Sequence, residues 1–131
     1  MNWHIGTVGF GYKQWRGTFY PQGMKSADYL SHYARFFGSA EIDSAVYGTP
    51  PLSTVEKWAR AVPADFRFTL KTPRVITHDT PLSQAVNPMT AFVERVRTLG
   101  DKLGAILIQF PATFRAGQLA ALNDFLTHLP T

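Results

Sequence analysis

Residues 66–71 read Phe-Arg-Phe-Thr-Leu-Lys, a strict alternation of apolar and polar side chains. Successive side chains of a β-strand point to opposite faces of the sheet, so this strand has one apolar and one polar face. A parallel strand that helices cover on both faces is instead apolar throughout. The stretch therefore predicts a strand that helices cover on one face only.

Three further short apolar stretches predict strands at residues 4–8, 40–44 and 105–110. A segment with helical features follows each of the four strands, and single-helix crossovers of this kind predict a parallel sheet. Apolar spacing and capping signals place the helices. We expect them at residues 27–37 after Ser26, 53–62 from a Ser53/Glu56 capping box, 88–99 after Asn87, and 116–129.

The polar face of the strands selects between two α/β architectures. A doubly wound sheet would bury charges such as Arg67 under helices, at a cost of several kcal/mol for each unpaired ion. A barrel places that face in its interior, and a complete barrel of this type has eight strand–helix units. With four such units, the chain is predicted to be a partial TIM barrel, a half-barrel of the α/β class in one domain over residues 1–131. The interior side chains would be Glu41, Asp43, Arg67, Thr69, Lys71 and Gln109.

The amino-acid composition limits the classes of protein to which the chain could belong. The 131 residues are 45% hydrophobic and 14% aromatic, which is sufficient for one globular core. The absence of cysteine excludes disulfides, thiolate metal sites and a cysteine nucleophile. No apolar run reaches membrane-spanning length and residues 1–9 lack the pattern of a signal peptide, so we expect a soluble cytoplasmic protein with no membrane partner.

The formal net charge of +4 fits ordinary solubility better than a polyanion-binding role. There is no run of basic residues and no nucleic-acid-binding motif. Two connections, residues 9–25 and 72–86, are long and follow the carboxyl ends of strands, where parallel α/β folds place their sites. Both are candidates for binding loops.

A set of short motifs resembles the YecE-like family, domain of unknown function 72, whose members are TIM-barrel proteins. The resemblance implies a protein about twice this length, of which residues 1–131 would be the N-terminal half, and it supplies no assigned reaction. The chain departs from the family pattern at Val8, Phe10 and Asp43 and within residues 46–50. The matching segments are residues 5–7 (IGT), 15–21 (WRGTFYP), 33–37 (YARFF), 41–44 (EIDS), 66–71, 73–78 (PRVITH), 100–104 (GDKLG) and 109–111 (QFP), together with Gly9 and Tyr12.

Candidate catalytic residues lie on the predicted interior face. Glu41 and Asp43 are two apart on one strand, and Lys71 lies on its neighbour. They would form either a carboxylate base beside a lysine electrophile or an interior salt-bridge network, and both interpretations fit. His78 would complete the catalytic group as a proton shuttle. A metal shell from Glu41, Asp43 and His78 lacks any local ligand spacing, so no metal ligands are predicted and the cofactor is unknown.

The first long loop carries the other candidate contacts. Tyr12, Trp15 and Arg16 would form a stacking and cationic wall for a substrate, or the loop would pack on itself through Phe19 and Tyr20.

Three hypotheses for function remain open from the sequence. The first is an enzyme-type site for an anionic or polar substrate, such as a phosphate-bearing one, with Lys71, Arg74 and Arg16 holding negative charge and Gln109 orienting the substrate. The second is a non-catalytic module that binds nucleic acid. The third is an inactive half-barrel, or one that works only when two copies pair through their open edges as a homodimer.

Overall fold

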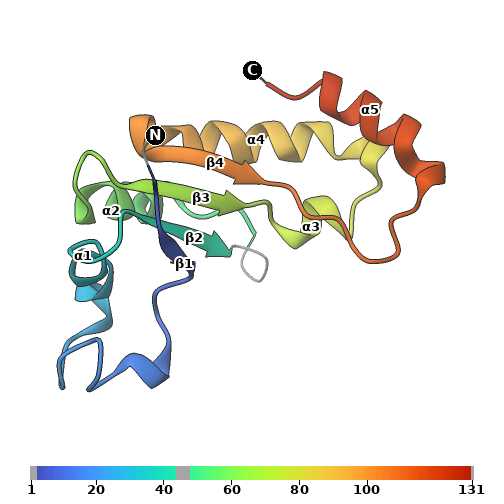
Figure 1. Cartoon of the computed structure of the whole chain (residues 1–131). Coiled ribbons are helices and arrows are strands. Elements are labelled where there is room, and N and C mark those ends of the chain that lie inside the picture. Colours follow the sequence, from blue (N-terminus) through green and yellow to red (C-terminus); the bar gives the residue numbers. More distant parts are fainter. Residues whose placement is uncertain (1–2, 44–47, 131) are drawn as a thin grey trace.

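The computed structural model describes residues 3–43 and 48–130 and contains a four-stranded parallel sheet (Figure 1). The strand order is sequential, and each strand is parallel to the next. A doubly wound sheet would reverse this order at a switch point, whereas barrels are wound in one direction. The predicted half-barrel of the α/β class is therefore confirmed. Its strands are β1 (Gly6–Val8), β2 (Ser39–Asp43), β3 (Arg67–Lys71) and β4 (Leu103–Leu107).

Helices lie between the strands, and α2 and α4 lie behind the sheet in Figure 1. Strand β4 ends before residues 108–110, which were predicted to belong to it, and Ser44 of the second predicted strand lies outside the described residues. The helices are α1 (Tyr29–Tyr33), α2 (Leu52–Ala61), α3 (Arg74–Thr77), α4 (Val86–Val96) and α5 (Leu119–Thr127), with 3₁₀ turns at Lys13–Trp15, Ser26–Asp28, Leu82–Gln84, Arg97–Lys102 and Ala116–Gln118.

The predicted helix starts were wrong. Helix α2 begins after Pro51 with no side-chain cap, and Asn87 lies inside α4. Proline-led turns make the first hydrogen bonds instead: the amide of Val55 donates to the carbonyl of Pro51, and that of Met89 to Ala85 at the end of a 3₁₀ turn. The first helix is also much shorter than residues 27–37, because a 3₁₀ turn precedes its five residues.

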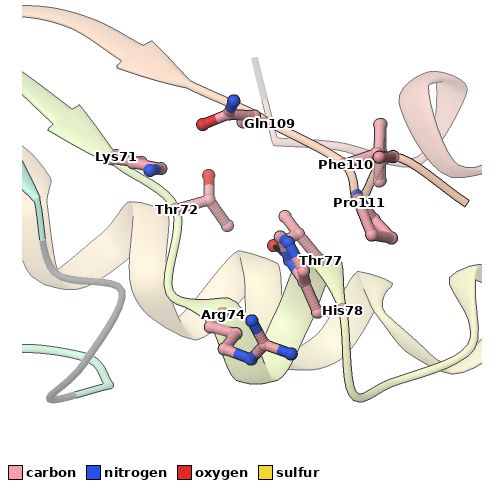
Figure 2. A pocket seen from close by; sticks show the side chains of 9 residues that line it. Lys71, Thr72, Arg74, Thr77, His78, Gln109, Phe110 and Pro111 are labelled. Carbon is pink, nitrogen blue, oxygen red and sulfur yellow. Dashed lines mark hydrogen bonds between the residues drawn. The ribbon is translucent and has the colours of Figure 1, made fainter. Parts of the chain in front are cut away.

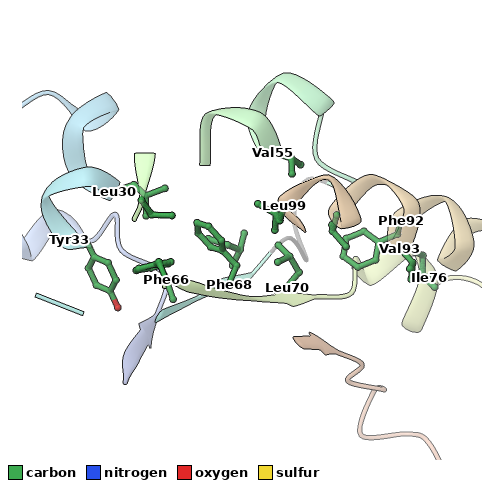
Figure 3. Packing of buried hydrophobic residues seen from close by; sticks show 14 of the residues in the cluster. Leu30, Tyr33, Val55, Phe66, Phe68, Leu70, Ile76, Phe92, Val93 and Leu99 are labelled. Carbon is green, nitrogen blue, oxygen red and sulfur yellow. The ribbon is translucent and has the colours of Figure 1, made fainter. Parts of the chain in front are cut away.

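One face of the sheet carries the core (Figure 3). Phe68 and Leu70 of β3 are fully buried there, against Val55 of α2 and Phe92 of α4. Full burial of each such side chain contributes roughly 1.5–3 kcal/mol. No described element covers the opposite face, where Leu107 is exposed. As the alternation predicts, Glu41, Asp43, Arg67, Thr69 and Lys71 are half-buried or exposed, and the alternate residues Ile42, Phe68 and Leu70 are buried.

Strand β1 is joined closely to β2 and to α1. The hydroxyl of Tyr33 accepts a hydrogen bond from the amide of Thr7 at 2.8 Å and donates one to the carbonyl of Ser39 at 3.0 Å. Gly6 pairs with Ser39, and a Cβ atom at Gly6 would lie 1.8 Å from that carbonyl oxygen. The pairing of β1 with β2 therefore requires glycine at this position.

An aromatic cluster fixes the first long loop on α1. Tyr20 is fully buried, its ring stacks on Tyr29 with centroids 4.0 Å apart, and its hydroxyl donates to the carbonyl of Phe10. Trp15 stacks parallel to Tyr33 and meets Phe19 edge-on. Burial, together with the neighbouring hydroxyls of Tyr33 and Tyr29, raises the pKa of Tyr20 to about 12.

Gly6→Ala is expected to lower the free energy of unfolding by about 2 kcal/mol or more, because the added methyl group collides with the backbone of β2. Urea denaturation measures the loss. Gly11→Ala is the matched control, since a Cβ atom there has no described neighbour within 4 Å, and its effect should stay within about 0.5 kcal/mol. Equal effects of the two variants would contradict the close approach of β1 and β2.

The buried hydroxyl of Tyr20 predicts a loss of stability at alkaline pH. Below its ordinary pKa of 10.0 the group is protonated in both states; between pH 10 and 12 the unfolded chain releases the proton and the folded chain keeps it. The free energy of unfolding therefore falls as the pH rises through this window, by about 3 kcal/mol from this group. Tyr20→Phe should remove that part of the fall, and Tyr12→Phe, at an exposed tyrosine, should not. Parallel pH curves for all three proteins would refute the assignment.

Candidate functional site

A hollow of about 240 Å³ lies where β3 and β4 end (Figure 2). In barrels of this type the carboxyl ends of the strands form the catalytic face. The hollow brings together four residues that the sequence predicted for a site: Lys71, Arg74, His78 and Gln109. Its other lining residues are Thr72, Thr77, Phe110, Pro111 and Ala112.

The chain after β3 places three of these side chains. The amide of Thr72 donates to the carbonyl of Leu107 at 2.8 Å, which holds the end of β3 against β4. The short helix α3 then begins at Arg74, and the amide of His78 donates to the carbonyl of Arg74 at 2.8 Å. Arg74 and His78 are thus one helical turn apart, on the same side of α3.

The His78 ring has a hydrogen-bonding partner at one of its two nitrogen atoms. Its Nδ1 atom lies 2.8 Å from the hydroxyl of Thr77, which is itself buried. A hydrogen bond at one ring nitrogen orients an imidazole and selects its tautomer. Thr77 is therefore a positioning residue for His78.

Lys71 is paired with Asp43 across the sheet. The two residues are neighbours in the register of β2 and β3, and Lys71 Nζ lies 3.4 Å from Asp43 Oδ2. The Lys71 side chain is 20% exposed and that of Asp43 is 41% exposed, so water reaches this pair from the Asp43 side. Both predicted interpretations, a catalytic pair and an interior salt bridge, fit this contact.

Arg74 has a weaker restraint. Its Nε atom lies 3.7 Å from Asp79 Oδ1, and both side chains are more than half exposed. An exposed pair of this kind contributes roughly 0–1 kcal/mol. The guanidinium group is therefore easily turned towards a ligand.

Glu41 does not line this hollow. It lies on the open face of β2, in register with Thr69 of β3 and Val8 of β1. The structure thus brings Asp43, and not Glu41, to Lys71.

The residues of the first loop are divided between two places. Tyr12 and Asp43 line a second hollow, of about 680 Å³, at the ends of β1 and β2. Because Asp43 also contacts Lys71, the two hollows adjoin at this ion pair. Trp15 packs in the aromatic cluster, and Arg16 lines a separate hollow near Tyr29 of α1, so neither is brought to Lys71.

Sequence reasoning missed two hydroxyl groups and the apolar wall of the first hollow. Thr72 precedes Pro73, Thr77 is the last residue of α3, and Phe110 and Pro111 follow Gln109 in the segment after β4. Thr72 and Pro111 directly follow predicted strands, which was the available signal for these two, whereas Phe110 was predicted to end the strand at residues 105–110. Their small or apolar side chains carried no chemistry that would have singled them out.

The metal shell considered from the sequence is not assembled. Within residues 3–43 and 48–130, no group of three or more histidine, aspartate or glutamate side chains is placed to hold a metal ion. Across the same residues, every helix is too short or too polar to cross a membrane.

Comparison with known proteins places the chain in a family. The model of "Protein of unknown function DUF72" matches residues 4–131. The UPF0759 protein YecE of Escherichia coli (strain K12) is 36% identical over 101 residues, which are 77% of this chain and 37% of that protein. The UPF0759 protein YunF of Bacillus subtilis (strain 168) is 27% identical over 117 residues, 85% of this chain and 40% of that protein.

Solved structures agree with these sequence matches. A DUF72 family protein from Thermotoga maritima superposes with a TM-score of 0.76 at 26% identity, over 98% of this chain and 52% of that one. One from Enterococcus faecalis gives 0.74 at 28% identity, over 95% and 46%. The chain thus spans about half the length of these solved proteins and less than half of the curated relatives. The chain belongs to the DUF72 family, and the resemblance found in the sequence is confirmed.

Proposed function

We propose that this DUF72 protein binds an anionic small molecule, with phosphate-bearing compounds as the ligand class, in the hollow at the ends of β3 and β4. One observation carries the proposal. Three basic side chains, Lys71, Arg74 and His78, line a hollow of about 240 Å³ whose described lining includes no carboxylate. Positive groups that converge on a concave site attract anions and raise their local concentration.

The geometry suits a phosphate group with a small organic part. Lys71 offers a point charge from the end of β3, and Arg74 offers a planar fork that matches phosphate oxygens. Gln109 adds an amide on the side of β4, and Phe110 and Pro111 form an apolar wall (Figure 2). The volume lies slightly below the usual range for drug-sized ligands, which favours a small molecule.

The same residues supply acid–base chemistry. A carboxylate 3.4 Å from a lysine ammonium group, as in Asp43 and Lys71, holds a base beside an electrophile. The His78 imidazole, oriented by Thr77, is placed to move a proton at the other side of the hollow. We assign Asp43, Lys71 and His78 to catalysis in this proposal, and Glu41 to the polar interior behind them.

The alternative of a nucleic-acid track receives less support. It needs aromatic and basic side chains side by side along one groove. Trp15 packs against Tyr33, and Arg16 lines a hollow that shares no residue with the one around Lys71.

Lys71→Ala and Arg74→Ala are each expected to weaken the binding of pyrophosphate about tenfold, the effect of one lost charge-assisted hydrogen bond. Isothermal titration calorimetry at low salt measures the affinity, and circular dichroism checks the fold. The control is Arg60→Ala on α2, an exposed residue whose guanidinium lies 3.9 Å from Glu56. If all three variants bind as the unmodified chain does, the hollow is not the anion site.

Asp43→Asn is expected to strengthen pyrophosphate binding, whereas the two alanine variants weaken it. Its carboxylate competes with a bound anion for Lys71, so its neutralisation should tighten pyrophosphate binding several-fold. If Asp43 is also the catalytic base, the same variant should lose about 100-fold or more of any phosphate release from phosphomonoesters. Tighter binding with unchanged release would leave the anion site in place and remove Asp43 from catalysis.

A further inference from the structure

We propose that the ligand of the anion site carries a planar ring, joined to its phosphate through a sugar, and that the ring binds in the second hollow, at the ends of β1 and β2. The proposed function supplies the phosphate site on which this rests, and the ring narrows the ligand class to nucleotide-like phosphate esters. The second hollow measures about 680 Å³, within the usual range for organic ligands, whereas the hollow around Lys71 measures about 240 Å³. The larger hollow therefore has the room for a ring.

The second hollow is lined mainly by aromatic side chains and bare backbone. Phe10 and Tyr12 line it from the loop after β1, and Trp58 lines it from α2. Gly11 adds backbone without a side chain, and Asp43 is the only charged residue in the described lining. Aromatic side chains stack on the faces of planar rings, and they do so with little dependence on which ring is bound.

Tyr12 presents an exposed ring that is already held in place. The residue is 44% exposed, its hydroxyl donates to the carbonyl of Val8, and its ring centroid lies 4.8 Å from that of Trp15. The ring also lies over Gly9, where a Cβ atom would be 3.8 Å from Tyr12 Cε2. A side chain that is fixed before binding loses little conformational entropy when a ligand stacks on it.

The ion pair of Asp43 and Lys71 joins the two hollows and determines the spacer. The hollows lie two strand positions apart, and since neighbouring strands are about 4.8 Å apart, their centres are separated by ~10 Å. A ring bonded directly to phosphate is too short to reach both. A sugar between the two supplies the length, and its hydroxyl groups can donate to the Asp43 carboxylate and accept from the Lys71 ammonium group.

Isothermal titration calorimetry with ADP and pyrophosphate tests the inference, because both probes carry a diphosphate and only ADP carries a sugar and a ring. At low salt and without divalent cations, we expect the dissociation constant of ADP to be at least tenfold lower than that of pyrophosphate. Lys71→Ala should weaken the binding of both probes, since both place a phosphate beside the lysine.

Gly11→Leu should remove most of the advantage of ADP and leave pyrophosphate binding unchanged, because it places a side chain at the second hollow. Gly11 does not have a positive φ, and a Cβ atom there has no described neighbour within 4 Å, so the fold accommodates the substitution. Gly117→Leu, in the 3₁₀ turn Ala116–Gln118, is the matched control; a Cβ atom there is equally unobstructed, and neither affinity should change.

Tyr12→Ala is the second variant, since it removes the stacking ring. It should weaken ADP binding about tenfold without a change for pyrophosphate, and circular dichroism checks the fold.

Two results would overturn the inference: equal affinities for ADP and pyrophosphate, or an advantage of ADP that either variant leaves intact. Equal affinities that Lys71→Ala lowers together would leave the proposed anion site standing without the ring site. Adenosine, which has no phosphate, gives the reverse distinction. Adenosine binding that Gly11→Leu abolishes, in a chain that does not bind pyrophosphate, would refute the anion site and leave the ring site; binding of none of the three probes would refute both.

Discussion

Burial of Phe68 and Leu70 against the helices is the constraint on which the rest of the structure depends. Because the side-chain period of a strand is two, this burial turns Arg67, Thr69 and Lys71 to the opposite face. A register shift of one residue would place two charges in the core. The apolar row therefore fixes which residue ends β3 on the open face, and that residue is Lys71, which lines the hollow.

Much of the fold was predictable because this constraint is visible in the sequence. Alternation at residues 66–71, together with the strand–helix repeat, predicted a parallel half-barrel with helices on one face. The helix starts were not predictable from Ser53 or Asn87, because prolines and 3₁₀ turns supply the first backbone bonds of α2 and α4. A capping motif indicates only a local preference for a helix start. The conformation of the preceding backbone can override this preference.

The candidate site was predictable where it depends on strand ends and unpredictable where it depends on tertiary packing. Lys71 and Gln109 meet because β3 and β4 are neighbours, and α3 brings Arg74 and His78 to the same hollow. From side-chain chemistry alone, Trp15 was as good a candidate for the site as these residues. Its ring instead stacks on Tyr33, a residue of α1 whose hydroxyl joins β1 to β2. No local sequence pattern predicts a contact between two residues this far apart in the chain.

The site and the open edge of the sheet meet in one segment of the chain. The carbonyl of Leu107 accepts the amide of Thr72, so the end of β4 is held against the start of the loop that carries Arg74 and His78. Gln109 follows two residues later and lines the hollow from the other side. A strand that pairs with the outer edge of β4 would contact this segment from outside, and a ligand in the hollow would contact it from within. Any effect of the one on the affinity for the other is matched by an equal effect of the other on the one, since coupling between two binding equilibria is reciprocal.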